Sequence, residues 1–377
     1  MNQGLLHSKQ SSKRAALRPR RAAPSSGVRR PDFGAGHVTP DRILELGYAF
    51  WKSKAVLSAV ELGLFTALGS GPLNGKTLAA RLKINRRGAA DFFDALVALG
   101  LLTRHANGRY ANAPDAGTYL DRNQPLYVGA LFQHMNARHY QNWSGLTQAL
   151  RTGTPQSILG NGSYPALYDD TATRDIFLNG MSAGSLLAAK ALANKFPWRD
   201  FGTVIDVGTA QGCVPVEIAR LHSHLTGGGF DLPPIERSFA SYVDKSGLSH
   251  RLHFYPGDFF TDPLPAADVL VMGRILHNWD VPTRKLLIRK AYRALPPGGA
   301  LIVYDPLISD ARRGHAHGLL SSLNMLIETK AGSEYTAAEC IAWFRNAGFA
   351  ATHIEPLDTL HTAVIGFKRG KVGFIRC

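Results

Sequence analysis

Three aspartates follow apolar runs in the second half of the chain, and together they could bind one polar ligand. Asp206 ends the run TVID, Asp231 lies 25 residues further on in GFDLP, and Asp258 lies in GDFF. A carboxylate repels phosphate, but it attracts a cation, an amino group or the hydroxyls of a ribose. Phe259 could pack against a purine beside Asp258. The set therefore suits an adenosyl ligand that carries a positive charge and no phosphate, such as S-adenosylmethionine.

The turn after Asp206 reads DVGTAQG and argues against other nucleotides. A dinucleotide-binding turn prefers G-x-G-x-x-G, and here Ala210 takes the place of the second glycine after Gly208. The Gly-Lys-Ser/Thr sequence of a phosphate-binding loop is absent from the chain. If Ala210 adopts the positive φ that such a turn requires, its backbone is strained.

These residues need a sheet to bring them together, and the pattern after residue 200 predicts one. Apolar strands are expected at 203–208, 227–233, 251–259, 267–277 and 300–308, with helices at 214–222, 236–247 and 282–295. This alternation predicts a doubly wound, Rossmann-like parallel sheet of the α/β class. Ligands of such sheets lie beyond the carboxyl ends of the strands, where the aspartates fall.

The first half of the chain reads as helices and a small wing. We expect a helix over 41–67, two helices within 76–101, and a β-hairpin over 102–113 closed by Asn107-Gly108. This is a winged-helix module, which serves either DNA binding or dimerisation. The second of the paired helices carries Asp91 and Asp94 and few groups that could read bases, so dimerisation is favoured. Residues 124–200 are expected to be helical.

Composition places the folded part in a reducing compartment. Residues 1–31 carry eight of the 43 Lys/Arg residues and no acid, so the net charge of +15 is largely a property of this tail. We expect residues 1–37 to be a disordered basic tail. A transit peptide is the alternative, although two prolines interrupt any amphipathic helix there. Three scattered cysteines argue against disulfides and a zinc site, and favour the cytoplasm.

Several motifs together resemble a known family. Asp206 with the glycine turn, GFDLP, GDFF, ILHNWD, LPPGG and SLNMLIETKAGSEYT are similar to those of plant-type and bacterial small-molecule O-methyltransferases. The resemblance covers roughly residues 40–368. It implies a winged-helix dimerisation domain over 38–120, a helical linker over 121–200 that contributes to the acceptor pocket, and an S-adenosylmethionine domain over 201–377. The chain departs from the family where three successive glycines are usual and Gly208-Thr209-Ala210 stands here.

The resemblance also assigns roles to residues. His277 matches the catalytic base, and Asp305 and Glu334 match the carboxylates that flank it, with Glu328 as a competitor for the second position. A histidine suits this task because its pKa lies near neutral pH, whereas that of a phenol lies near 10. The matching cosubstrate contacts are Ser185, Asp206, Gly208, Asp231, Leu232, Asp258, Phe259 and Arg274, and those of the acceptor pocket are Met181, Asn324, Met325, Phe132 and Trp143.

The sequence thus predicts a homodimeric O-methyltransferase that uses S-adenosylmethionine on the hydroxyl of a small aromatic metabolite, without metal, nucleic acid or membrane partners. Two alternatives remain open: methylation at carbon or nitrogen, or a hydroxylase-like use of the cosubstrate, by the same fold; and a winged-helix regulator of transcription.

Overall fold

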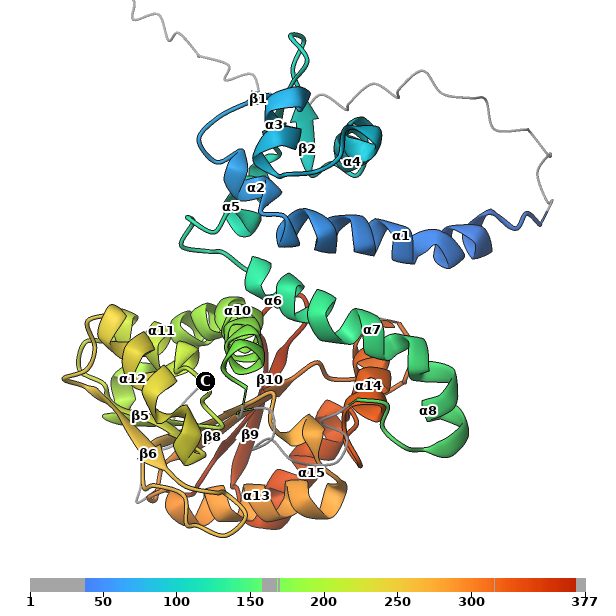
Figure 1. The fold of residues 1–377 in the computed structure, drawn as a ribbon. Helices are drawn as coiled ribbons and strands as arrows, with labels where there is room; N and C mark the ends of the chain where they lie inside the picture. Colours follow the sequence, from blue (N-terminus) through green and yellow to red (C-terminus); the bar gives the residue numbers. More distant parts are fainter. Residues whose placement is uncertain (1–37, 158–167, 169, 315, 371–377) are drawn as a thin grey trace, which may run out of the picture. The chain divides into compact units, whose positions relative to one another are not determined.

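A computed structural model describes residues 38–157, 168, 170–314 and 316–370, and the predicted tail over 1–37 lies outside these ranges. The chain divides into two units, residues 1–49 and 50–377. Figure 1 labels the helices and strands.

The predicted winged module is present, with two differences. The expected helix over 41–67 ends at Glu61, because Gly63 adopts a φ of 71° and a separate short helix follows. A short strand before the paired helices joins the hairpin in a three-stranded antiparallel sheet of order β1-β3-β2. The elements are α1 (Asp41–Glu61), α2 (Leu64–Ala67), β1 (Leu73–Asn74), α3 (Gly75–Arg81), α4 (Arg86–Ala98), β2 (Leu102–Arg104), β3 (Arg109–Asn112) and α5 (Pro114–Leu120).

Local signals fix the paired helices of this module. The side chain of Asn74 accepts a hydrogen bond from the amide of Thr77 at the start of α3, and Asn85 caps α4 in the same manner. Asp94 of α4 accepts hydrogen bonds from Tyr110 and Arg104 of the wing. Asp94 therefore links α4 to the wing of the same module.

The segment between the module and the large sheet is helical, as predicted, but irregular. It contains α6 (Gly129–His134), a single turn of π-helix η1 (Met135–His139), α7 (Tyr140–Asn142), the 3₁₀ turn η2 (Trp143–Gly145), α8 (Leu146–Thr152) and α10 (Thr171–Lys195). By length and composition alone, α10 is apolar enough to cross a membrane. It packs against α6 and α11 and buries residues along its length, so it is a core helix of this domain.

The C-terminal domain is built on a seven-stranded sheet of order β6-β5-β4-β7-β8-β10-β9. The five predicted strands are present and parallel. Two C-terminal strands were not predicted from the sequence, and of these β10 runs antiparallel to both β8 and β9. The strands are β4 (Thr203–Val207), β5 (Thr226–Asp231), β6 (Leu252–Pro256), β7 (Val269–Gly273), β8 (Ala300–Asp305), β9 (Ala351–Pro356) and β10 (Thr362–Phe367).

Alternate residues of the central strands form a core on each face of this sheet. Val269 and Val271 of β7 pack with α10 and α11, whereas Leu270 and Met272 pack with α13 and α15 on the other face (Figure 1). Strand order reverses between β4 and β7, and the carboxyl ends of strands flanking such a reversal form a crevice. The helices of this domain are α11 (Cys213–Leu221), α12 (Glu236–Lys245), α13 (Val281–Ala294), α14 (Ala316–Glu328) and α15 (Ala337–Ala347), with 3₁₀ turns η4 (Trp198–Asp200), η5 (Pro233–Ile235) and η6 (Leu276–Asn278).

Candidate active site

A cavity of about 570 Å³ lies at the carboxyl ends of the parallel strands. Its size lies within the usual range for small-molecule sites. Strands β4, β5 and β7 contribute their ends, and α10, η1 and α14 contribute side chains to the wall. Most residues that the sequence proposed for binding come together here: Met181, Ser185, Asp206, Gly208, Asp231, Leu232, Asp258, Phe259, Arg274, His277, Asn324 and Met325.

The turn after β4 has the backbone that its glycines suggested. Gly208 and Gly212 adopt φ values of 75° and 91°, and Ala210 between them adopts 51°. A Cβ at Gly208 would lie 2.3 Å from the end of the Ile275 side chain, which would have to shift. The strain expected at Ala210 is therefore present, because an L-residue with a side chain rarely adopts this conformation.

Asp231 ties this turn to the end of the neighbouring strand. One carboxylate oxygen accepts a hydrogen bond of 2.8 Å from the amide of Ala210, and the other accepts one of 2.7 Å from Leu232. Burial raises the pKa of Asp231 to about 6, against the opposing effect of these two amides. Burial also raises the pKa of Asp206 to about 8, although the Thr209 hydroxyl opposes this rise. Two acids whose pKa values are raised by desolvation favour a ligand that brings positive charge or hydroxyl donors.

An aromatic group borders the end of β6. Asp258 accepts a hydrogen bond of 2.8 Å from the amide of Phe260, which closes the turn that follows the strand. The rings of Phe259 and Trp279 meet edge to face, with centroids 5.9 Å apart, and both residues line the cavity. This gives the wall beside Asp258 a flat apolar surface of the kind that can pack against a purine.

Arg274 places a guanidinium nitrogen inside the cavity wall without a partner. Its backbone is in the left-handed region, with a φ of 57°, and its amide donates to the carbonyl of Tyr304 at 2.8 Å. Nη1 is buried and makes no hydrogen bond within the described part of the chain. Gly184 leaves room for it, since a Cβ there would lie 2.7 Å from Nη1. A buried cationic donor without an acceptor indicates an anionic ligand group at this point.

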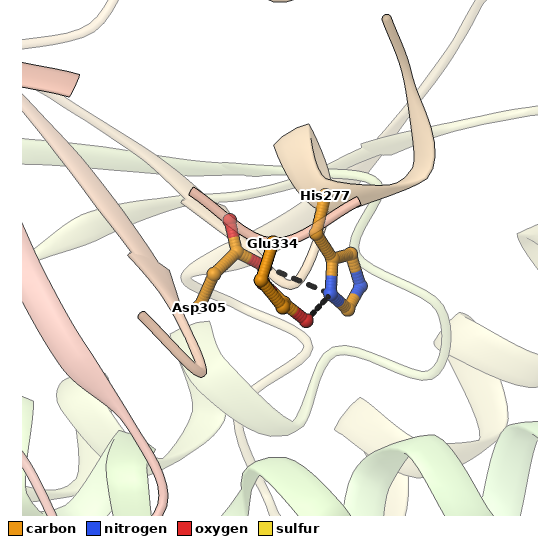
Figure 2. A group of neighbouring side chains, drawn as sticks. All are labelled: His277, Asp305 and Glu334. Atoms are coloured by element: carbon orange, nitrogen blue, oxygen red, sulfur yellow. Dashed lines mark hydrogen bonds and ion pairs between the residues drawn. The ribbon is translucent and has the colours of Figure 1, made fainter. Parts of the chain in front are cut away.

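His277 lies in the turn η6, shortly after β7, and is flanked by two carboxylates. Nδ1 is 2.7 Å from Oε1 of Glu334 and 3.6 Å from Oδ1 of Asp305. Figure 2 shows both carboxylates on the same side of the ring, which leaves Nε2 facing away from them. We name these three residues the base cluster. The geometry suits a proton on Nδ1 that is donated to Glu334, with Nε2 available to a substrate.

The charges of the base cluster determine its proton affinity. Burial opposes protonation of His277, but the attraction of Glu334 and Asp305 outweighs it, so the pKa of His277 lies above its usual value. Burial raises the pKa of Asp305 to about 7, against the effect of His277. A histidine with this environment is a base that is available near and above neutral pH.

Neighbouring groups hold the base cluster in place. Ser321 donates a hydrogen bond of 2.7 Å to Glu334, and Tyr335 donates to the second oxygen of Asp305. Arg284 is 1% exposed and donates to the carbonyls of Leu276 and Ser333, on either side of the cluster. The three groups of the base cluster offer metal-ligating atoms within 4.8 Å of one another. Within the described residues, Oδ1 of Asp305 and Oε2 of Glu334 are buried without a hydrogen-bond partner.

The structure shows which of Glu334 and Glu328 lies beside His277, a choice that the sequence left open. Glu334 contacts His277, whereas Glu328 accepts hydrogen bonds from Arg138 and Asn142. Glu328 is therefore not the flanking carboxylate.

Two residues expected in the acceptor pocket are placed elsewhere. Phe132 does not line the cavity and packs against the core of the winged module. Trp143 also lies outside the lining, and its indole donates a hydrogen bond of 2.9 Å to Asn324, which does line it. Trp143 therefore orients a pocket residue and does not border the pocket. Three further residues, His134, Arg138 and His139, line the cavity at η1 and were not predicted from the sequence.

Comparison with known proteins agrees with these features. Residues 143–350 match the family model of the O-methyltransferase domain, and residues 44–122 match that of the O-methyltransferase dimerisation domain. The chain is 42% identical, over 87% of its length and 97% of the relative, to the tetracenomycin polyketide synthesis 8-O-methyl transferase TcmO of Streptomyces glaucescens. It is 37% identical to the N,N-dimethyltransferase OxyT of Streptomyces rimosus, over 84% of this chain and 93% of the relative.

A solved structure shows the same fold with a ligand. The crystal structure of human N-acetylserotonin methyltransferase in complex with S-adenosylmethionine has a TM-score of 0.81 and 26% identity, and the match covers 89% of this chain and 99% of that one. The cavity, its acids and the two matched domains have one common explanation: the chain belongs to the S-adenosylmethionine-dependent O-methyltransferases.

Proposed function

We propose that this enzyme methylates a hydroxyl group of an aromatic secondary metabolite, and that His277 is the general base. The observation that carries the proposal is the contact of 2.7 Å between Nδ1 of His277 and Glu334, inside a cavity that also contains the acids expected for the cosubstrate. The name of the Streptomyces glaucescens relative, which refers to methylation in polyketide synthesis, supports an aromatic acceptor.

The residues of the glycine turn and the strand ends would hold the cosubstrate. Asp231 has free lone pairs for ribose hydroxyls, and Asp258 with Phe259 would receive the adenine. Arg274 would bind the carboxylate of the amino-acid tail, because its Nη1 has no partner within the described residues. Asp206 would face the positively charged end, which would bring its pKa back toward the ordinary range. When bound, S-adenosylmethionine supplies a methyl group attached to a cationic sulfur.

The base cluster would then remove the proton of the acceptor hydroxyl. Nε2 of His277 accepts that proton while Nδ1 continues to donate to Glu334, and the negative charges of Glu334 and Asp305 stabilise the imidazolium that forms. Met181, Asn324 and Met325 line the cavity and would hold the ring of the acceptor. Alignment of the phenolate with the methyl group supplies the remaining part of the rate enhancement.

We further propose that the enzyme is a homodimer formed through its N-terminal region. The match to the dimerisation domain supports this assembly. A groove on the second unit, lined by Trp51, Leu62, Ile84, Phe92 and Tyr140, gives an apolar surface that a second copy could cover.

Methyl-transfer assays test the proposed reaction. Purified enzyme with S-adenosylmethionine and a panel of phenols should form methyl ethers, detected by mass spectrometry. His277→Ala should lower kcat by about 10²-fold or more, because general base catalysis is worth this much. The affinity for S-adenosylhomocysteine, measured by calorimetry, should stay nearly the same. Unchanged turnover in His277→Ala would exclude the base role, and transfer to amines alone would exclude a hydroxyl acceptor.

A further inference from the structure

A turn of π-helix interrupts the helix that forms one wall of the cavity. In η1, the amide of Tyr140 bonds to the carbonyl of Met135, five residues earlier. With this spacing, two residues that lie four and five positions after a given residue share a face with it. In an ordinary α-helical turn, the residue five positions later would point elsewhere. His134, Arg138 and His139, which we name the π-turn cluster, consequently all line the cavity. Such turns are rare and occur frequently at functional sites.

The two histidines of this cluster have ring nitrogens without partners. His134 is 3% exposed, and its ring meets that of His139 edge to face with centroids 4.9 Å apart. Neither ring makes a hydrogen bond within the residues that the structure describes. Gly180 of α10 allows this packing, because a Cβ there would lie 2.5 Å from Cβ of His134. Both rings line the cavity, so their nitrogens can form hydrogen bonds with a ligand group there.

Hydrogen bonds from two of its nitrogens fix the guanidinium of Arg138, and the third nitrogen is left over. Its Nε and Nη2 donate to Glu328 at 2.8 and 2.6 Å, and Nη2 also donates to Ser157 at 2.7 Å. Asn142 holds the other oxygen of Glu328 at 2.9 Å. Nη1 of Arg138 makes no hydrogen bond to the described residues, so its two N–H groups are available.

The electrostatic environment of the cluster favours an electron-rich group. The pKa of His134 is lowered to about 3 and that of His139 to about 4, chiefly by burial; Arg138 and Arg274 act in the same direction, and Glu328 opposes the change at His139. Both imidazoles are therefore neutral at physiological pH, and each offers one N–H donor. Together with Nη1 of Arg138, they present more donors than acceptors to the cavity.

We propose that the π-turn cluster binds a second oxygen function of the aromatic acceptor, a ring carbonyl or a carboxylate, and so selects oxygenated polycyclic phenols over simple ones. This inference rests on the proposed function, since it concerns the acceptor of the same reaction. Arg138 of the cluster contacts Glu328. Glu328 lies on α14, as do Asn324 and Met325, which we propose to hold the acceptor, so the cluster faces the acceptor part of the cavity. The second oxygen would turn the acceptor so that the reacting hydroxyl faces His277.

The inference is tested with three small-molecule probes and with substitutions of His139. Hydroxynaphthoate carries a carboxylate, hydroxyanthraquinone carries a carbonyl, and naphthol carries neither. Affinities are measured by calorimetry with S-adenosylhomocysteine present, and methyl transfer is measured separately. His139→Leu removes the imidazole, His139→Asn restores a donor and an acceptor, and His250→Leu is the matched control because His250 is exposed and distant from the cavity lining.

We expect wild type to bind at least one of the two probes with a second oxygen function, hydroxynaphthoate or hydroxyanthraquinone, more tightly than it binds naphthol. His139→Leu should weaken binding of the anthraquinone by about 2- to 12-fold or of the naphthoate by about 10- to 150-fold, according to whether the bond goes to a neutral or a charged oxygen. Naphthol binding should be unchanged, His139→Asn should recover part of the loss, and His250→Leu should match wild type.

The outcomes separate the two proposals. Equal affinity of wild type for all three probes, or an equal loss for naphthol in His139→Leu, would overturn the selective role of the π-turn cluster while leaving methyl transfer intact. Failure of wild type to methylate any of the three, with S-adenosylhomocysteine still bound, would instead contradict the aromatic acceptor and the present inference with it.

Discussion

Replacement of Glu334 by glutamine isolates the charge that acts on the base. The amide has the same shape and can still accept the proton of Nδ1 through its oxygen, so the ring of His277 should keep its position. What disappears is the negative charge 2.7 Å from Nδ1, which is a leading cause of the raised pKa of His277. Asp305, at 3.6 Å, remains.

The size of the effect follows from the strength of the bond that changes. A hydrogen bond to a charged group contributes about 1.5–3 kcal/mol, and a neutral one about 1 kcal/mol. The difference is about 0.5–2 kcal/mol, and 1.36 kcal/mol corresponds to one unit of pKa. In Glu334→Gln, the pKa of His277 should therefore fall by about 0.5–1.5 units, and the imidazolium formed during proton transfer loses the same stabilisation. We expect kcat to fall by about 3- to 30-fold at the alkaline plateau.

The assay is the pH profile of kcat/KM at saturating cosubstrate, measured by product formation between pH 5.5 and 9. Wild type should lose activity as the pH falls through the pKa of His277, which lies above 6.5, because the protonated ring cannot accept a proton. Glu334→Gln should move this acid limb to lower pH and lower the plateau. Glu236→Gln, at an exposed glutamate of α12, is the control. An unchanged limb together with an unchanged plateau would refute the base assignment for His277.

Three further perturbations have expected outcomes. Asp231→Ala removes an acceptor of two amide hydrogen bonds and should weaken S-adenosylhomocysteine binding by about 10- to 150-fold in calorimetry, since charged hydrogen bonds contribute about 1.5–3 kcal/mol; undiminished affinity would contradict its place in the site. Ala210→Gly should stabilise the protein by about 0.5–1 kcal/mol in chemical unfolding, because relief of about 1–2 kcal/mol of left-handed strain exceeds the entropic cost of glycine; a loss of stability would show that φ is not strained there. The free protein should lose thermal stability as the pH rises from 6 to 9. The raised pKa values of Asp206 and Asp305, about 8 and about 7, give stability that is complete below their ordinary value near 4 and lost as the pH rises through those values. Asp206→Asn should flatten this decline in differential scanning fluorimetry, and an equally steep decline would show that Asp206 does not titrate there.

Much of the fold was predictable because each prediction rested on a local signal. The apolar runs that end at Asp206, Asp231 and Asp258 alternate with helical patterns, and this alternation leaves few topologies. Asn107-Gly108 identified the wing for a similar reason, since few sequences close a tight hairpin. Strands β9 and β10 were missed although Thr362–Phe367 is almost wholly apolar. A single apolar run of six residues does not distinguish a buried strand from other structure without an alternation around it.

Site residues could be predicted where they directly follow a strand. They could not be predicted where the direction of the side chain depends on the geometry of a helix. His277 comes shortly after β7, so its place in the sheet agreed with its match to the base of the family that the sequence resembles. Glu328 and Glu334 lie six residues apart in sequence, but α14 ends at Glu328 and the chain then turns, so the two carboxylates meet different partners, Arg138 and His277. The π-turn cluster had no signal at all, because the sequence pattern of an ordinary helix does not place residues five apart on one face.

Desolvation of the acids in this site lowers the stability of the free protein, and it also determines which ligands the site can bind. Desolvation is the chief cause that raises the pKa values of Asp206, Asp231 and Asp305, so these acids keep their protons at a higher pH than they would in water. Asp206 and Asp231 lie at the ends of β4 and β5, and Asp305 lies 3.6 Å from His277, whereas Arg274, with its unpartnered Nη1, and the π-turn cluster line the same cavity. A ligand pair with a cationic centre, a carboxylate and an oxygen-rich aromatic ring would satisfy all of them at once. A nucleotide with phosphates would place negative charge against Asp206 and Asp231, which excludes it more strongly than shape alone could.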